Sequence, residues 1–236
     1  MSRLNFLRSI GLALLIIAGL NPPAVRAEEK YSTAETLLFF TNHLGEISRP
    51  NTLRYSFKKE GALEPGFQDQ VQIFIERVGQ DGTKFVSTKF LSGEREKNFP
   101  PVENARGNPV LMYFLTRDVF EMQRLTGGNW RYFKRLISQA FAESAEVRAV
   151  KFDYNGKQIS GTEIKIAPYV NDPKRERYQR FAGKYYVFVL APGVPGGIYQ
   201  IRTVVPSEGG GEAKPLIEET MTFSGAEVLT KSSLKN

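Results

Sequence analysis

The residue types that most often carry enzyme chemistry are scarce in this sequence. The chain has one histidine, His43, and no cysteine, so a Ser-His-Asp or Cys-His site would have to be built on His43. His43 stands beside apolar residues of a predicted helix, where we expect a surface or half-buried side chain. The same counts exclude thiol chemistry and a structural zinc site, which needs several histidine or cysteine ligands. We therefore name no catalytic residue, no metal ligand and no cofactor.

One enzymatic alternative stays open. A hydrolase can pair two carboxylates from distant strands, and no local motif reveals such a pair. No segment spaces its acids as a calcium-binding loop does. The glycine run at residues 209–211 lacks the lysine and the helix that a phosphate-binding loop requires.

Residues 169–180 crowd basic side chains and two tyrosines into a predicted connection between strands. The segment is either a docking patch for an acidic partner or lipid headgroups, or a solvated loop whose charges pair with one another. Its candidate docking residues are Lys174, Arg175, Arg177 and Arg180.

Large apolar side chains are abundant, with 17 Phe, 10 Tyr and one Trp. A sheet covered on one face does not need so many. They either fill an ordinary core or line a cavity for an apolar ligand. The candidates for such a lining come from two predicted helices and one predicted strand. They are Phe114, Leu115, Met122, Trp130 and Phe133 from the helices, with Tyr185, Val187 and Val189 from the strand.

Residues 1–27 have the three regions of a secretory signal peptide. Basic residues come first, an apolar run follows at residues 10–20, and Val25-Arg26-Ala27 predicts cleavage after Ala27. The apolar run is short of the ~20 residues that span a bilayer, and prolines at 22 and 23 end it early, which disfavours an uncleaved anchor. Because the chain has no cysteine, it has no site for a lipid-modified cysteine anchor. We expect a periplasmic protein that is not tethered and has no transmembrane span.

Residues 28–236 are expected to form a single domain, with a frayed tail from about residue 225. Loss of residues 1–27 removes three basic residues and lowers the formal charge from +7 to +4. So small an excess does not predict a nucleic-acid partner.

Periodicity places the elements of this domain. Ser32 and Glu35 form a capping-box pattern before a helix at residues 33–44. Alternation with period two at residues 52–91, with a turn at Asp81-Gly82, predicts a three-stranded antiparallel meander. Two helices follow within residues 109–142, joined through Gly127-Gly128, and should form a helical hairpin. The remaining strands are predicted at residues 147–154, 157–166, 184–190, 198–205 and 215–223.

This order predicts an α+β domain in which an N-terminal helix and an inserted helical hairpin cover an antiparallel sheet. The order resembles that of the periplasmic lipoprotein carriers of the LolA family and their outer-membrane partner LolB. The resemblance implies a strongly curved sheet, like an open barrel, whose helices enclose an apolar cavity for acyl chains. LolB is anchored through a cysteine that this chain lacks, so the likeness is to the soluble carrier.

Three classes of function follow. The first is an exported carrier or binding protein for an apolar or acylated ligand, such as a lipid or a lipoprotein. The second is a non-enzymatic accessory protein of envelope assembly that docks a protein or anionic headgroup through the basic segment. The third is the dispersed-carboxylate hydrolase. A cavity between helices and sheet would favour the first class, and a solid core with an exposed patch the second.

Overall fold

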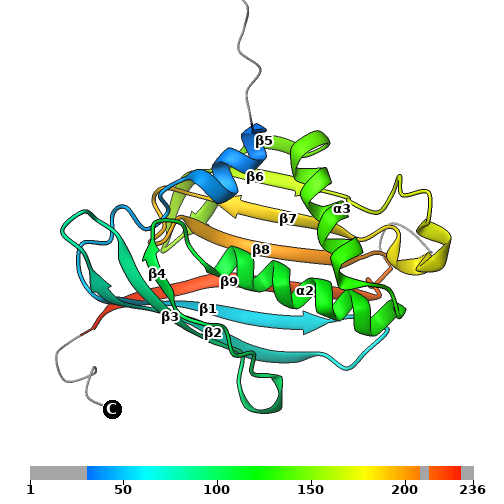
Figure 1. Cartoon of the computed structure of the whole chain (residues 1–236), viewed down its shortest axis with the longest axis horizontal. Coiled ribbons are helices and arrows are strands. Elements are labelled where there is room, and N and C mark those ends of the chain that lie inside the picture. The colour runs from blue at the N-terminus through cyan, green and yellow to red at the C-terminus, as the bar shows by residue number, and fades with distance from the viewer. Residues whose placement is uncertain (1–30, 208–212, 230–236) are drawn as a thin grey trace, which may run out of the picture. The chain divides into compact units, whose positions relative to one another are not determined.

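The computed structural model describes residues 31–207 and 213–229, which fall in one compact unit, Tyr31–Asn236. The predicted signal peptide, residues 1–27, lies outside the described residues. The described strands form one antiparallel sheet in the order β4-β3-β2-β1-β9-β8-β7-β6-β5 (Figure 1). They are β1 (Asn51–Glu60), β2 (Phe67–Val78), β3 (Lys84–Phe90), β4 (Val102–Ala105), β5 (Glu146–Tyr154), β6 (Lys157–Ile166), β7 (Tyr185–Leu190), β8 (Ile198–Val205) and β9 (Ile217–Val228).

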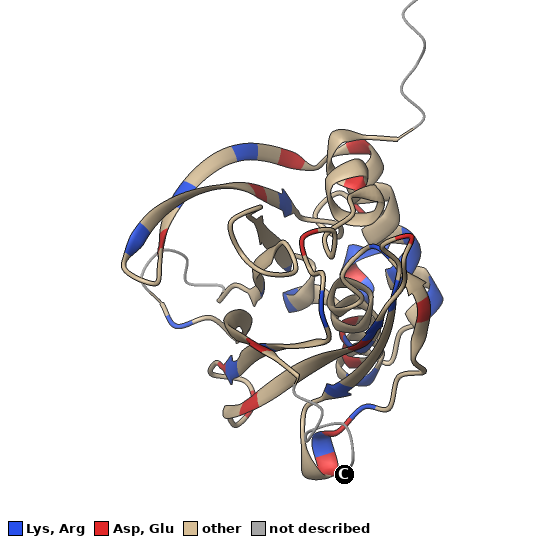
Figure 2. Cartoon of the chain, turned by 90° about the vertical axis from the view of Figure 1, so that its left-hand side faces the viewer, with Lys and Arg blue, Asp and Glu red and all other residues tan. Residues whose placement is uncertain are grey.

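The sheet joins two meanders through its last strand. Strand β9 lies between β1 and β8, antiparallel to both, so it connects strands that come before and after the helical hairpin in the sequence. Seen from one end, the sheet curves, and the helices cover its open side (Figure 2). The predicted α+β class, with a curved antiparallel sheet under an N-terminal helix and a helical hairpin, is confirmed.

The C-terminal tail is more ordered than its sequence predicts. We expected fraying from about residue 225, yet β9 continues past Gly225 and pairs with β1 as far as Val228. The backbone N–H of Leu229 then donates to the carbonyl of Pro50 at 3.0 Å. The bulge opposite Arg54 lets the strand resume its pairing, and that local irregularity hides the strand from a test of strict alternation.

The N-terminal helix is shorter than predicted. The capping box of Ser32 and Glu35 forms as expected, and α1 (Thr33–Glu35) runs into a π-helical turn, η1 (Thr36–Phe40). Thr41 is extended and ends the helix, and its hydroxyl donates to the carbonyl of Thr36. The helix therefore stops four residues before Leu44, and His43 lies in the loop that follows. Strand β4, in the connection before the hairpin, was not predicted.

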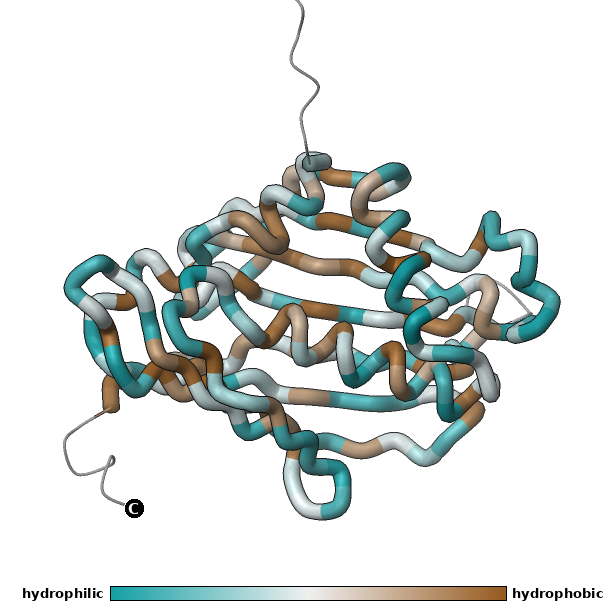
Figure 3. Tube along the Cα trace, viewed as in Figure 1, coloured by the Kyte–Doolittle hydropathy of each residue, from teal (hydrophilic) through white to brown (hydrophobic). Residues whose placement is uncertain are grey.

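The helical hairpin forms where its turn residues place it. Helix α2 (Val110–Thr126) ends at Gly127, whose φ of 68° is the left-handed conformation that glycine adopts without strain. The side chain of Asn129 caps α3 (Trp130–Glu143) by accepting from the N–H of Arg131. Apolar residues recur along both helices and along the strands behind them (Figure 3).

Between the hairpin and the sheet the structure is packed with aromatic rings. Phe57 of β1 contacts Phe114 of α2 at 6.3 Å between ring centroids, and Phe141 of α3 contacts Phe188 of β7 at 5.5 Å. Each of these four rings is 2% exposed or less. Part of the excess of aromatic residues therefore fills a core beneath the helices.

Candidate functional site

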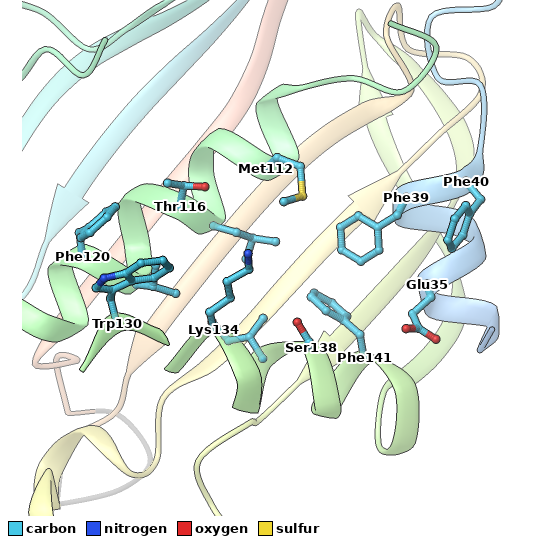
Figure 4. Close-up of a pocket in the computed structure, with 13 residues that line it drawn as sticks. Glu35, Phe39, Phe40, Met112, Thr116, Phe120, Trp130, Lys134, Ser138 and Phe141 are labelled. Atoms are coloured by element: carbon cyan, nitrogen blue, oxygen red, sulfur yellow. The ribbon is translucent and has the colours of Figure 1, made fainter. Parts of the chain in front are cut away.

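Three helical segments frame an apolar groove on the side of the hairpin away from the sheet. Helices α2 and α3 diverge from their Gly127-Gly128 turn, and side chains of α1 and η1 stand at the far end (Figure 4). The groove has a volume of about 520 Å³. Its lining is mostly apolar: Phe39, Phe40, Met112, Leu115, Val119, Phe120, Trp130, Ile137 and Phe141, with Glu35, Thr116, Lys134 and Ser138 as the polar members.

The rim of this groove keeps large apolar side chains in contact with water. Phe40 is 57% exposed, Phe120 49% and Met112 47%. Phe120 and Trp130 face each other across the narrow end, with their ring centroids 5.4 Å apart. A contiguous apolar surface of this kind on a folded domain marks a binding site more often than chance exposure does.

The far end of the groove is tied together by contacts between segments distant in sequence. The hydroxyl of Ser32 donates to the carbonyl of Phe141 at 2.8 Å, and Phe39 packs edge-on against Phe141 at 5.3 Å. These contacts hold α1 and η1 against the end of α3. The groove is thus a fixed feature of three packed helices.

One cation lies in the apolar lining. Lys134 extends from α3 toward the middle of the groove, between the α2 side chains and those of α3 (Figure 4). No described acid forms an ion pair with it. The groove's only carboxylate, Glu35, is engaged at the far end, where it accepts from the N–H of Ser32. A ligand in the groove would therefore meet apolar walls and one positive charge.

The opposite side of α2 is pinned to the sheet by buried ion pairs. The Arg117 guanidinium donates to both carboxylate oxygens of Glu219 on β9, at 2.7 and 3.0 Å, and Lys59 of β1 lies 3.8 Å from the same carboxylate. Burial raises the pKa of Glu219, but the charge and hydrogen bonds of Arg117, with Lys184 and Lys59, outweigh it and hold the pKa below its usual value.

A second buried pair follows directly along α2. Asp118 is 0% exposed, pairs with Lys184, and accepts from the hydroxyl of Tyr186 at 2.6 Å. The Tyr186 hydroxyl also lies 3.0 Å from that of Tyr169. Burial, with the charge of Asp118, raises the pKa of both tyrosines well above the usual value. Because these charges are paired and closed to solvent, we assign them to holding α2 in place.

His43 also has a structural environment. Its Nε2 lies 2.9 Å from the carbonyl of Leu37, and its Nδ1 accepts from the N–H of Asn108 at 3.3 Å, just before α2. The ring is 8% exposed, and burial lowers its pKa from the usual value despite the Leu37 hydrogen bond. Both nitrogens are used within the fold in the neutral form. Among the described residues, no group of three or more His, Asp or Glu side chains could hold a metal ion.

The structure divides the predicted lining residues into three sets. Leu115 and Trp130 line the groove. Phe114, Met122 and Phe133 are at most 1% exposed and pack in the core beneath the helices. The three strand residues, Tyr185, Val187 and Val189, alternate with the core residues of β7 and lie on the other face of the sheet.

The prediction that these three strand residues face the helices is therefore wrong. Tyr186 and Phe188 take that position, since their side chains contact Asp118 of α2 and Phe141 of α3. The error has a simple cause. Residues 185–190 are apolar or aromatic throughout, so alternation gives two equal choices of face, and a shift of one residue exchanges them.

Sequence reasoning missed most of the groove. Phe39, Phe40, Met112 and Phe120 are apolar residues that stand off the buried stripe of their helices. That departure from the helical pattern is the signal that could have revealed them.

The predicted docking residues lie at two short 3-10 turns, η3 (Arg175–Arg177) and η4 (Gln179–Phe181). Lys174 directly precedes η3, and all four basic side chains are exposed. Asp172 anchors the segment to α3, because its carboxylate accepts from Tyr132 at 2.7 Å and also from Tyr178. The basic side chains thus project from a fixed loop.

No protein-family model matches the sequence, and no curated protein matches it either. Solved structures do match. The lipoprotein LppX of Mycobacterium tuberculosis is 10% identical, with 73% of this chain and 84% of that chain covered and a TM-score of 0.28. A LolA superfamily protein of Nitrosomonas europaea is 9% identical (85% and 95% covered, TM-score 0.23), and a DUF1329 family protein of Desulfovibrio piger is 8% identical (86% and 96% covered, TM-score 0.28).

The likeness to these three structures is distant, with identities of 8 to 10%. Their TM-scores lie below 0.5, so functional inference has to come from the groove and the charges of this chain. None of the helices in residues 31–207 and 213–229 has the length and apolar character needed to cross a membrane.

Proposed function

We propose that this chain is a carrier or binding protein for an apolar or acylated ligand, which it holds between α1/η1, α2 and α3. The observation that supports the proposal is the groove of about 520 Å³, whose rim exposes Phe40, Met112 and Phe120. Its volume lies in the usual range for small-ligand sites, about 300 to 1,000 Å³. We further propose that the protein works in the periplasm after removal of residues 1–27.

The energetics set the kind of ligand. A buried methylene contributes about 0.8 kcal/mol, so ten methylenes contribute at most about 8 kcal/mol. Association itself costs about 4 kcal/mol or more, and an open groove leaves part of the chain in water. We therefore expect firm binding only for acyl chains longer than about ten carbons, or for shorter chains whose headgroup reaches Lys134.

The test is native mass spectrometry of the purified protein with organic extraction, followed by displacement of a fluorescent fatty acid. The groove variant is Phe120→Arg, which puts a charge on the rim without touching the core. The matched control is Val228→Arg, because Val228 is 51% exposed at the end of β9 and is not part of the groove lining. We expect saturable binding that Phe120→Arg lowers at least tenfold and Val228→Arg leaves unchanged.

A protein that copurifies with no lipid and binds no probe would contradict the proposal. The accessory-protein alternative would then be favoured, since the solid core beneath the hairpin and the exposed basic loop both fit it.

A further inference from the structure

Basic side chains gather at the narrow end of the groove, from two segments distant in sequence. Residues 130–135 of α3 and residues 174–180 of the loop together have seven basic residues and one acid, Glu176. The two segments adjoin, because Lys174 and Arg177 line a hollow together with the glycines of the α2–α3 turn. The basic residues are Arg131, Lys134, Arg135, Lys174, Arg175, Arg177 and Arg180, and all are exposed.

None of these seven cations forms an ion pair with any acid in residues 31–207 or 213–229, whereas Arg117, Arg124 and Arg202 elsewhere each do. Three of the seven lie over aromatic rings instead. Arg131 is 4.6 Å from the Trp130 ring centre, and Arg135 and Lys174 are 5.1 and 5.4 Å from that of Tyr132.

The acids near the groove only partly neutralise this cluster. Asp172 lies within it, but its buried carboxylate accepts from the hydroxyls of Tyr132 and Tyr178 and feels the charge of Arg135 without forming an ion pair. Glu35 and Glu143 stand toward the other end of α3. Glu121 and Glu64 are paired with Arg124 at the end of α2, and that hydrogen bonding lowers the pKa of Glu64 to about 2. The seven cations therefore outnumber the two acids among them, Asp172 and Glu176, and leave a net positive charge.

Aromatic side chains stand directly beside the cations. Phe120 is half exposed and contacts the partly buried Trp130, and Arg131 lies over the indole. An acidic protein partner would explain the charge but gives no role to the exposed ring of Phe120. A bilayer explains both, because aromatic rings settle at the headgroup level and lysine and arginine approach the phosphates.

We propose that this basic-aromatic face, made of the seven cations with Phe120 and Trp130, docks on an anionic lipid bilayer. Each basic residue near such a surface strengthens binding about fivefold, and the attraction falls off over a Debye length of about 8 Å at physiological salt. Docking sets the narrow end of the groove against the lipid headgroups. It does not depend on the groove holding a ligand.

The test is sedimentation of the ligand-free protein with vesicles of phosphatidylcholine alone or mixed with phosphatidylglycerol. The charge-reversal variant is Lys174→Glu with Arg177→Glu. The matched control is Lys151→Glu with Lys157→Glu, which changes the net charge equally on the exposed β5–β6 hairpin. Because Trp130 is the only tryptophan, its emission reports directly on this face.

We expect binding only to the anionic vesicles, lost at high salt, with a blue shift of Trp130 emission. The docking variant should bind more than about tenfold more weakly and the control less than threefold. Failure to bind anionic vesicles would overturn the proposal and leave an acidic protein as the partner. Equal losses in the two double variants would overturn the assignment to this face. Fatty-acid displacement in the absence of vesicles reports separately on the groove, so the two proposals can fail independently.

Discussion

The two sides of helix α2 differ in burial and in the kind of contact they make. Toward the sheet, Arg117 and Asp118 are buried and paired, and Phe114 is buried against Phe57. Toward α3, Met112 and Phe120 are half exposed and meet a groove. Lifting α2 off the sheet would break these buried ion pairs, so we expect a ligand to enter between the helices and not beneath them.

One substitution tests the buried ion pair between α2 and the sheet. Arg117→Ala removes both hydrogen bonds to the buried carboxylate of Glu219 and leaves it with only the more distant charges of Lys184 and Lys59. We expect the free energy of unfolding to fall by about 3 to 5 kcal/mol. Arg124→Ala, at an ion pair whose arginine is half exposed, should cost less than about 1 kcal/mol. Urea unfolding of both variants measures the difference. Equal costs would mean that α2 is not pinned through its buried face.

Two phenylalanines of the hairpin, one buried and one exposed, test how firmly the hairpin packs. Phe133 of α3 is 1% exposed and packs edge-on against Tyr169 and Tyr178, whereas Phe120 is 49% exposed. We expect Phe133→Ala to cost about 3 kcal/mol and Phe120→Ala less than 1 kcal/mol. Thermal unfolding checks both. An unchanged melting temperature for Phe133→Ala would show the hairpin to be a mobile arm, and the groove would lose its fixed walls.

The start of α2 should respond to pH through His43. Its pKa is lowered in the folded protein, so between that value and the unfolded value of about 6.5 the unfolded chain binds more protons. The stability contribution is complete above pH 6.5 and is lost as the pH falls toward the folded pKa. We expect the free energy of unfolding, measured with urea, to decrease between pH 7 and pH 5. His43→Gln should flatten the profile in this window, and an unchanged profile would contradict the assignment.

The sequence predicted where helices and strands lie better than which of their faces point toward the core. Glycines at 127 and 128, and the turn at Asn155-Gly156, placed the hairpins correctly because their conformations are local. Strand β7 was placed correctly but turned the wrong way, since both of its faces are apolar. The groove depends on how far α2 and α3 diverge, which no local sequence pattern indicates. The pairing of Arg117 with Glu219 joins residues 102 positions apart, so it leaves no local pattern either.

Trp130 allows a direct measurement of where the ligand lies. Titration with a fatty acid brominated in mid-chain, which quenches an indole only on contact, should quench Trp130 saturably if the chain lies between α2 and α3. Relocating the probe provides the control: in Trp130→Phe with Val187→Trp, the tryptophan stands on the outer face of β7 and should not be quenched. Binding by displacement without quenching of Trp130, or equal quenching at both positions, would contradict a ligand held between the helices.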